Sequence, residues 1–167
     1  MEQHVRHGDF YLNVGMSDGG VVGAFSNALG AFWPGVQVLF GDINAGISSH
    51  RAFSSLAQRY GFLPEAFNVA TMEAARGNRG YPLRPELAES SYLLYKATRD
   101  PQYLETGAAM VRALQTRART RCGFAALGDV TNSDKEDKMD SYFLSETMKY
   151  LFLLFSENDA DLLDVDQ

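Results

Sequence analysis

Two helical segments joined by only two residues constrain the fold of this chain more than any other feature. The first helix is predicted to begin at Pro85, because proline at the first helical position lacks only an amide that has no partner inside the helix. It extends to Thr98. Asp100 and Pro101 then provide an N-cap and another first-position proline, and the following helix is predicted to run to about Arg117. Helices joined by so short a connection pack as an antiparallel pair, an α/α hairpin.

Other helices are predicted on both sides of this hairpin. Pro34 begins a short helix that reaches Leu39, and a longer helix covers residues 43–60, where Gly61 ends it. The last helix is predicted over residues 139–155. Helices that recur in this way are typical of stacked α/α hairpins.

The segments between the helices favour turns and short strands, because Gly, Pro, Asn and Asp gather there. The predicted elements are a β-hairpin over residues 9–25 with its turn at 15–20, a loop over 61–83 with one turn of helix at 66–75, a β excursion around Gly128 over 124–131, and a charged loop over 132–138. The expected fold class is therefore all-α, with α/α hairpins and short β-hairpins. No linker divides residues 1–167, and the acidic residues 156–167 are expected to be frayed.

Composition excludes several classes of function. The net charge of −6 and the lack of a basic run argue against a nucleic-acid surface, and no apolar run is long enough to predict a membrane segment. Cys122 is the only cysteine, so no disulfide can close within the chain, and its redox state stays open. His4, His7 and His50 lack the spacing of metal ligands and are expected to be surface or packing residues.

Two glutamates lie in the first turn of the helix that begins at Pro85. Glu86 and Glu89 are three residues apart and share one side of that turn, and neither has a lysine four positions further on. Acids in a first turn complement the helix dipole by ~0.3–1 kcal/mol each. Spacing alone favours this interpretation over an acidic binding site.

Several blocks of sequence indicate a functional role for Glu86 and Glu89 instead. Residues 84–90, which read RPELAES, are followed by blocks at 122–126 and 136–155 and preceded by blocks at 31–39 and 63–68. In this order they resemble glycoside hydrolase family 47, the class I α-1,2-mannosidases, and the upstream blocks are most similar to the endoplasmic-reticulum (ER) degradation-enhancing mannosidase-like branch. The resemblance implies part of an (α/α)7 barrel. Residues 1–167 would then be a single partial domain from the C-terminal portion of the catalytic domain.

The resemblance also implies a reaction. It is the inverting, calcium-dependent removal of terminal α-1,2-linked mannose from N-glycans, in which carboxyl groups ~6.5–9.5 Å apart flank the scissile bond and a water. Glu86 would be the general base, and Tyr142 would lie under the sugar ring, where the family usually has phenylalanine. The residues implied to contact substrate are Arg84, Glu65, Glu89, Tyr142 and Glu146. No direct calcium ligand is assigned, and Glu86, Glu89 and Glu146 would reach Ca²⁺ through water, since calcium takes oxygen ligands and waters.

More than one function stays open at this stage. The family's general acid and its other catalytic carboxylate precede the region that matches this chain, so the chain alone is expected to carry half of a site and to be inactive. The alternatives are a non-catalytic module that binds mannose glycans in glycoprotein quality control, and a helical scaffold whose acids are solvated, with Glu146 paired to Lys149. The resemblance implies location in the ER. It also implies high-mannose N-glycans on misfolded glycoproteins and ER oxidoreductases as partners.

Overall fold

The structure is a computed structural model that describes residues 2–156, and most of the predicted tail at residues 156–167 lies outside the described residues.

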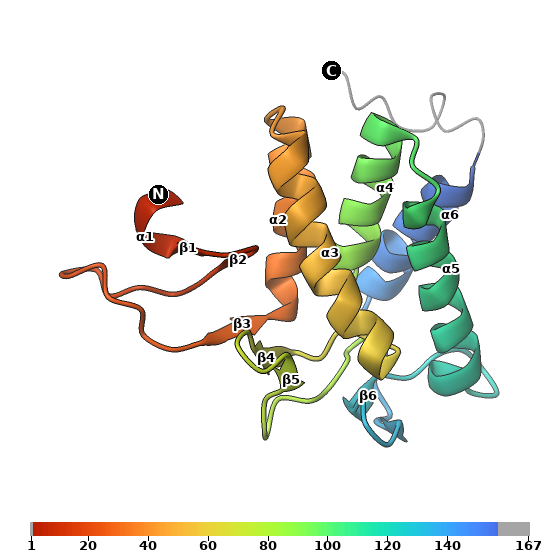
Figure 1. Cartoon of the computed structure of the whole chain (residues 1–167). Coiled ribbons are helices and arrows are strands. Elements are labelled where there is room, and N and C mark those ends of the chain that lie inside the picture. Colours follow the sequence, from red (N-terminus) through yellow and green to blue (C-terminus); the bar gives the residue numbers. More distant parts are fainter. Residues whose placement is uncertain (1, 157–167) are drawn as a thin grey trace.

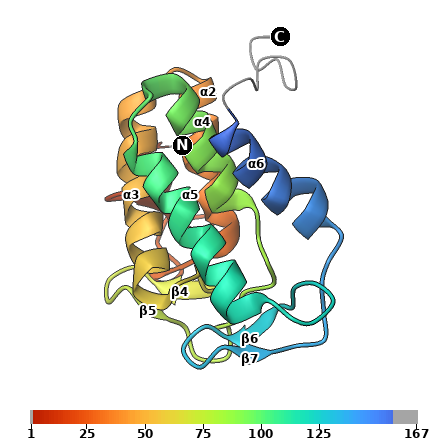
Figure 2. The same cartoon turned by 90° about the vertical axis from the view of Figure 1, so that its right-hand side faces the viewer.

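Helix α4 (Glu86–Thr98) lies at the centre of the helices. The pair α2 (Trp33–Leu39) and α3 (Ile43–Tyr60) packs on one side of it, and α5 (Gln102–Ala113) and α6 (Lys149–Phe155) pack on the other (Figure 1). In the perpendicular view, the hairpin of β6 (Leu127–Asp129) and β7 (Asp134–Lys135) lies below the lower ends of the helices (Figure 2).

The predicted helical hairpins are confirmed, together with the caps that define them. The Asp42 side chain accepts a hydrogen bond from the Ala45 amide at the start of α3, and Gly61 ends α3 with a φ of 79°, which suits glycine. After α4, Arg99 takes the left-handed conformation with a φ of 57°, and Asp100 accepts a bond from the Gln102 amide. The chain therefore reverses direction within the short connection that the sequence predicted.

Helix α4 is central because it is buried around most of its circumference. Ser90 makes the tightest contact, since its hydroxyl donates to the Ala31 carbonyl at 2.6 Å and accepts from the Gly35 amide at 3.0 Å. A side chain at Gly35 would meet Leu93 at 2.8 Å, so glycine permits the close approach of α2 and α4. Buried hydrogen bonds to a serine thus join adjacent helices at their close approach.

Two wider, π-helical stretches extend the helices, one at the end of α5 and one at the start of α6. Stretch η2 (Leu114–Ala118) continues α5 and ends close to the predicted boundary. Stretch η3 (Phe143–Met148) precedes α6, so the last helix starts about four residues later than the predicted Met139. The reason is non-local: the Lys138 carbonyl accepts from the Ala126 amide at 2.8 Å, which keeps this segment extended.

The predicted hairpin over residues 9–25 needs correction because its strand residues pair with segments outside it. Strand β1 (Arg6–His7) follows the short helix α1 (Glu2–Val5) and pairs with β2 (Phe10–Tyr11), so the predicted hairpin over 9–25 is reduced to a bridge between Val14 and Val21. Strand β3 (Phe25–Asn27), just before the 3-10 helix η1 (Ala28–Phe32), instead pairs with β4 (Ala66–Asn68).

The helical turn predicted at residues 66–75 is wrong, since β4 pairs with β5 (Glu73–Ala74). Phe67 explains the strand, because its fully buried ring packs against Phe10 and Phe53. The β excursion is also centred differently: Gly128 lies inside β6, and residues 130–133 form the turn to β7. A side chain at Gly128 would meet the Glu136 carboxylate at 2.9 Å.

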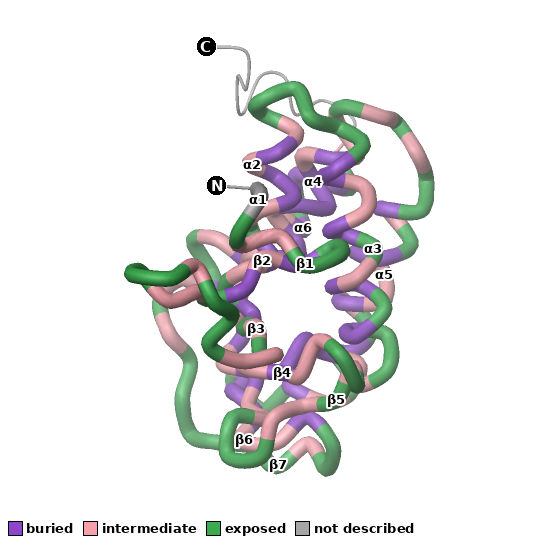
Figure 3. The backbone as a smooth tube through the Cα atoms, turned by 60° about the vertical axis from the view of Figure 1, so that its left-hand side comes forward, coloured by how far each residue is buried: buried purple, intermediate pink, exposed green. Residues whose placement is uncertain are grey.

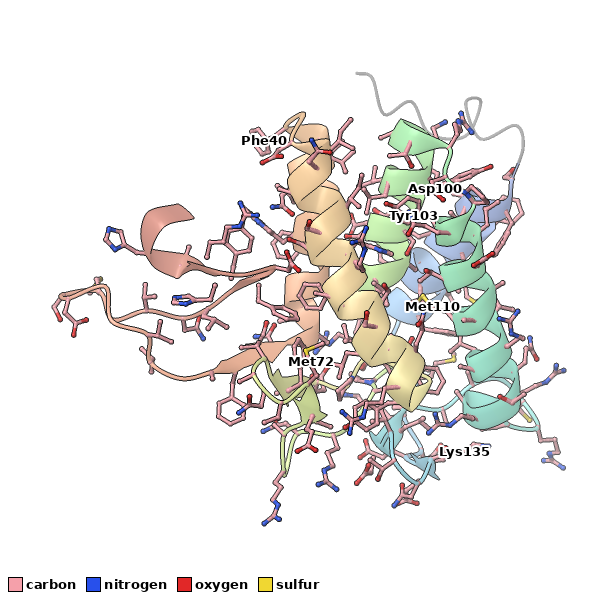
Figure 4. All side chains as sticks on the ribbon, viewed as in Figure 1. Phe40, Met72, Asp100, Tyr103, Met110 and Lys135 are labelled. Carbon is pink, nitrogen blue, oxygen red and sulfur yellow. The ribbon has the colours of Figure 1, made fainter. Side chains whose placement is uncertain are left out.

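Burial follows the helix contacts and leaves both edges of the assembly open. Buried residues concentrate where the helices face one another, while the N-terminal segment and the loops are mostly exposed (Figure 3). Large apolar side chains are nevertheless exposed at the α2 edge, where Phe40 is 86% exposed (Figure 4). On α6, Phe152 is 64% exposed. Apolar surface of this kind is typical of a contact face.

Candidate active site

The candidate site lies where the loops below the helices meet the start of α4. Tyr81 and Leu127 exchange backbone hydrogen bonds at 2.7 and 2.9 Å, and the Glu65 amide donates to the Gly80 carbonyl. These bonds bring together the segment that leads into α4, strand β6 and the residues that precede β4. Glu65 and Arg84, which are 19 residues apart, therefore meet.

Glu65 and Arg84 form a bidentate ion pair. The guanidinium donates to both carboxylate oxygens of Glu65, at 2.6 and 2.9 Å, and the side chains are 24% (Arg84) and 32% (Glu65) exposed. The bond to Glu65 raises the pKa of Arg84, so its charge is permanent. Arg84 also lies over the Tyr142 ring at 5.9 Å, which fixes the guanidinium plane between an acid and an aromatic face.

The residue before Arg84 has an unusual backbone conformation. Leu83 has a φ of 64°, which is unfavourable for a side chain with a Cβ, and it is fully buried. Its carbonyl accepts a hydrogen bond from the buried Thr147 hydroxyl of η3 at 2.7 Å. The contact fixes the direction from which Arg84 and Pro85 enter α4.

Glu86 combines burial with an unpaired oxygen. The pKa of Glu86 is raised, mainly because the carboxyl group is buried, and the charges of Glu65 and Glu89 add to the increase. Its own backbone amide and the charge of Arg84 lower the pKa but do not cancel the effect of burial. Oxygen Oε2 has no hydrogen-bond partner among residues 2–156. The side chain lines a cavity of about 20 Å³ with Tyr81 and Arg84, which is room for one water molecule.

Glu89 belongs to a neighbouring group on α4 and α6. Burial raises its pKa, although the Tyr150 hydroxyl donates to Oε1 at 3.0 Å and favours the charged form. The negative charge of Glu146 adds to the increase. Glu146 itself pairs with Lys149 at 2.8 Å, as the alternative reading from spacing proposed.

Tyr142 is held by its hydroxyl. The phenolic oxygen lies 2.7 Å from the Pro82 carbonyl and 2.9 Å from Asp140 Oδ2, and burial together with Asp140 raises the tyrosine pKa. These contacts account for tyrosine at a position where the resembled family usually has phenylalanine. Stacking under a sugar ring remains a prediction.

The structure thus brings all six predicted site residues to one region, in two adjoining groups. Glu65, Arg84, Glu86 and Tyr142 form one group, and Glu89 and Glu146 form the other, one helical turn along α4. Sequence reasoning missed the residues that hold them in place, which are Tyr81, Leu83, Asp140, Thr147 and Tyr150. The only signal for Asp140, Thr147 and Tyr150 was their place within the block at residues 136–155.

No direct calcium ligand was predicted in this chain. Within residues 2–156, no group of three His, Cys, Asp or Glu side chains is placed to hold a metal ion. The water-mediated contacts of Glu86, Glu89 and Glu146 with Ca²⁺ stay a prediction.

Other sequence predictions have clear outcomes. His50 is a packing residue, as expected, because it is 3% exposed and lies between Ser91 and the Tyr103 ring. Cys122 is an exposed free thiol. In the described part of the chain, every helix is too short or too polar to cross a bilayer.

Comparisons with known proteins agree with this geometry. The family model "Glycosyl hydrolase family 47" matches residues 1–167. Alpha-mannosidase I MNS4 of Arabidopsis thaliana is 50% identical over 153 residues, which is 92% of this chain and 24% of that protein. ER degradation-enhancing alpha-mannosidase-like protein 3 of Homo sapiens is 47% identical over 140 residues, 84% of this chain and 15% of that protein. This chain therefore spans about a quarter or less of these relatives.

A solved structure shows where the fold belongs. The alpha-1,2-mannosidase from Trichoderma reesei superposes with a TM-score of 0.76 at 23% identity, over 93% of this chain and 39% of that one. That protein is an (α/α)7 barrel, so the helical pairs described here are an arc of such a barrel. With a family model that covers its whole length, this chain belongs to glycosyl hydrolase family 47.

Proposed function

We propose that this chain supplies the general-base side of an α-1,2-mannosidase site. The substrate is the terminal α-1,2-linked mannose of high-mannose N-glycans, the reaction inverts the anomeric centre, and the setting is the disposal of misfolded glycoproteins in the ER. The names of the relatives support the substrate class and the setting. Residues 1–167 are then one partial domain, and the remaining catalytic carboxylates come from the rest of the barrel.

The observation that carries this proposal is the state of Glu86. A general base needs an oxygen that is free to accept a proton and a pKa raised towards the working pH. Glu86 has both, whereas Glu65 is neutralised by Arg84 and Glu146 by Lys149. Glu86 would take a proton from a water as that water attacks the anomeric carbon, and Arg84 would hold the sugar hydroxyls beside it.

The remaining acids would orient the sugar and the ion that the family uses. Glu89 is fixed by the Tyr150 hydroxyl and lies close enough to Glu146 for their charges to interact. We propose that these two carboxylates, with Glu86, face water molecules around Ca²⁺, where the ion would organise water and sugar hydroxyls. ER oxidoreductases stay a proposed partner on resemblance alone.

A binding module without catalysis is the other candidate. It is favoured by two ion pairs, Glu65 with Arg84 and Glu146 with Lys149. Carboxylates whose charge is balanced by a cation can bind sugar hydroxyls without moving a proton. The two functions differ in what the rest of the barrel supplies.

The test uses a chimaera in which this chain replaces the matching segment of Arabidopsis thaliana alpha-mannosidase I MNS4. We expect it to release mannose from an α-1,2-linked oligosaccharide, and we expect Glu86→Gln to lower turnover by ~10²–10⁴ while binding persists. Glu105→Gln is the matched control, since Glu105 also lies in a first helical turn but is exposed. A Glu86→Gln turnover equal to that of the control would remove Glu86 from the mechanism. A chimaera that binds the oligosaccharide without cleaving it would favour the binding module.

A further inference from the structure

The last helix contacts the segment that leads into α4 through two hydroxyl groups. The Tyr142 hydroxyl lies 2.7 Å from the Pro82 carbonyl oxygen, and the Thr147 hydroxyl donates to the Leu83 carbonyl at 2.7 Å. Residues five apart do not share a face of an α-helix, but a π-helix closes each turn with a hydrogen bond over five residues. The π-helical stretch η3 therefore directs both side chains to one side, where they contact consecutive carbonyl groups.

The bond made by Thr147 differs from those of other helical threonines. Thr98, Thr106 and Thr116 each donate to the carbonyl four residues earlier, which is the usual arrangement inside a helix. Thr147 is 0% exposed and instead donates to a residue 64 positions away. Its hydroxyl thus makes a tertiary contact with the segment before α4.

Leu83, which accepts this bond, has a backbone conformation that leucine seldom adopts. Among the described residues other than glycine, Met72, Leu83, Arg99 and Ser133 have a positive φ. The other three are partly or fully exposed, whereas Leu83 is 0% exposed. An unfavourable conformation persists only where the surrounding structure imposes it, and such residues cluster at functional sites. The bond from Thr147 and the burial of the Leu83 side chain are contacts that impose it here.

The conformation of Leu83 determines how the chain enters the candidate site. Arg84 follows directly and donates to both carboxylate oxygens of Glu65, and Glu86 lies two residues further on. A change of φ at Leu83 would rotate the chain that follows it and separate Arg84 from Glu65. Glu86 would move with it, and a displacement of ~1 Å from the productive geometry can lower a reaction rate by ~10²-fold.

Resting on the proposed function, we propose that Thr147 is a positioning residue of the mannosidase reaction. Its hydroxyl keeps Leu83 in the unfavourable conformation and thereby sets the positions of Arg84 and Glu86. Because Thr147 is fully buried, it acts through the Leu83 carbonyl and not by contact with the sugar.

The test compares three variants of the chimaera with its parent. Thr147→Val keeps the shape of the side chain but cannot donate, and we expect its kcat to fall by ~10–100-fold. Thr147→Ser keeps the hydroxyl and loses a methyl group, so we expect a kcat close to that of the parent although the fold is less stable. Ser145→Ala is the matched control, because Ser145 is an exposed residue of η3 whose hydroxyl bonds within the helix, to Ser141.

Turnover is measured well below the melting temperature of each variant, which separates rate from stability. A purely structural role would lower the melting temperature of both Thr147→Val and Thr147→Ser and leave both kcat values near that of the parent. If Thr147→Val does not fold, Thr147→Ala is compared with Thr147→Ser in the same way.

The outcomes distinguish this inference from the proposed function. Equal kcat values in the variants with and without the hydroxyl would overturn the inference and leave the proposed function standing. A parent chimaera without turnover would overturn the proposed function, and this inference with it.

Discussion

His50 makes the stability of this fold depend on pH. Its ring is buried between α3, α4 and α5, and Nε2 lies 2.8 Å from Ser91 Oγ. Since Ser91 already donates its only proton to the Leu87 carbonyl, Nε2 must be the donor to Ser91. Protonation of the ring would place a second N–H at Nδ1, and no hydrogen-bond acceptor for that group is found among residues 2–156. Burial therefore lowers the pKa of His50 from 6.5 to about 4.

The magnitude follows from linkage between proton binding and folding. A tenfold change in proton affinity is worth ~1.4 kcal/mol, so a pKa that falls from 6.5 to about 4 corresponds to ~3 kcal/mol. The unfolded chain binds the proton more tightly than the folded chain. This contribution is thus fully present above pH 6.5 and is lost as the pH falls from 6.5 to about 4.

Hydrogen exchange of peptides from α3 and α4, corrected for the intrinsic effect of pH, measures the free energy of opening around His50. We expect that free energy to fall by ~3 kcal/mol between pH 7 and pH 4 relative to a His50→Gln variant. Glu86 and Glu89, whose raised pKa values stabilise the fold as pH falls, are present in both proteins and cancel in the difference. Parallel pH profiles in the two proteins would refute the reasoning.

Three further predictions concern the site and the edges. Thr147→Val should destabilise the fold by ~1–3 kcal/mol, measured by urea unfolding of the chimaera, because the buried Leu83 carbonyl loses its donor; an unchanged midpoint would show that this contact is unimportant. Arg84→Lys should lower turnover of the chimaera at least tenfold with little change in stability, since lysine cannot make the bidentate bond to Glu65. Phe152→Ser should reduce self-association of the isolated chain in sedimentation velocity, whereas Met16→Ser, at an exposed residue of a turn outside the helices, should not.

The helices could be predicted from sequence because their signals are local. Asp42, Gly61, Pro85 and Asp100 each mark a boundary through bonds or φ values within a few residues. The strands could not be predicted in this way. Ser26 pairs with Phe67, and the burial of Phe67 against Phe10 overrides the local preference of residues 66–75.

The site could be predicted only in part for the same reason. The resemblance identified acids by their position in short blocks, but the groups that hold them come from far along the chain. Tyr150 reaches Glu89 over 61 residues, and Thr147 reaches Leu83 over 64. The positive φ of Leu83 has no signal in the sequence, because leucine seldom adopts it, and the burial of its side chain and the bond from Thr147 to its carbonyl are non-local.

The opposing readings of Glu86 from sequence, a helix-dipole acid or a general base, are reconciled by its two oxygens. Its own backbone amide favours the charged form of the carboxylate, as expected for an acid at a helix N-terminus, whereas Oε2 has no hydrogen-bond partner among the described residues. A buried carboxylate oxygen without a partner disfavours the charged form and raises the proton affinity of the group. The first turn of α4 therefore favours the carboxylate at this position, while Oε2 is left to accept a proton. The same first-turn position that favoured the structural reading is what positions a base, and for that reason Glu105, an exposed acid in the first turn of α5, is the control that separates the two.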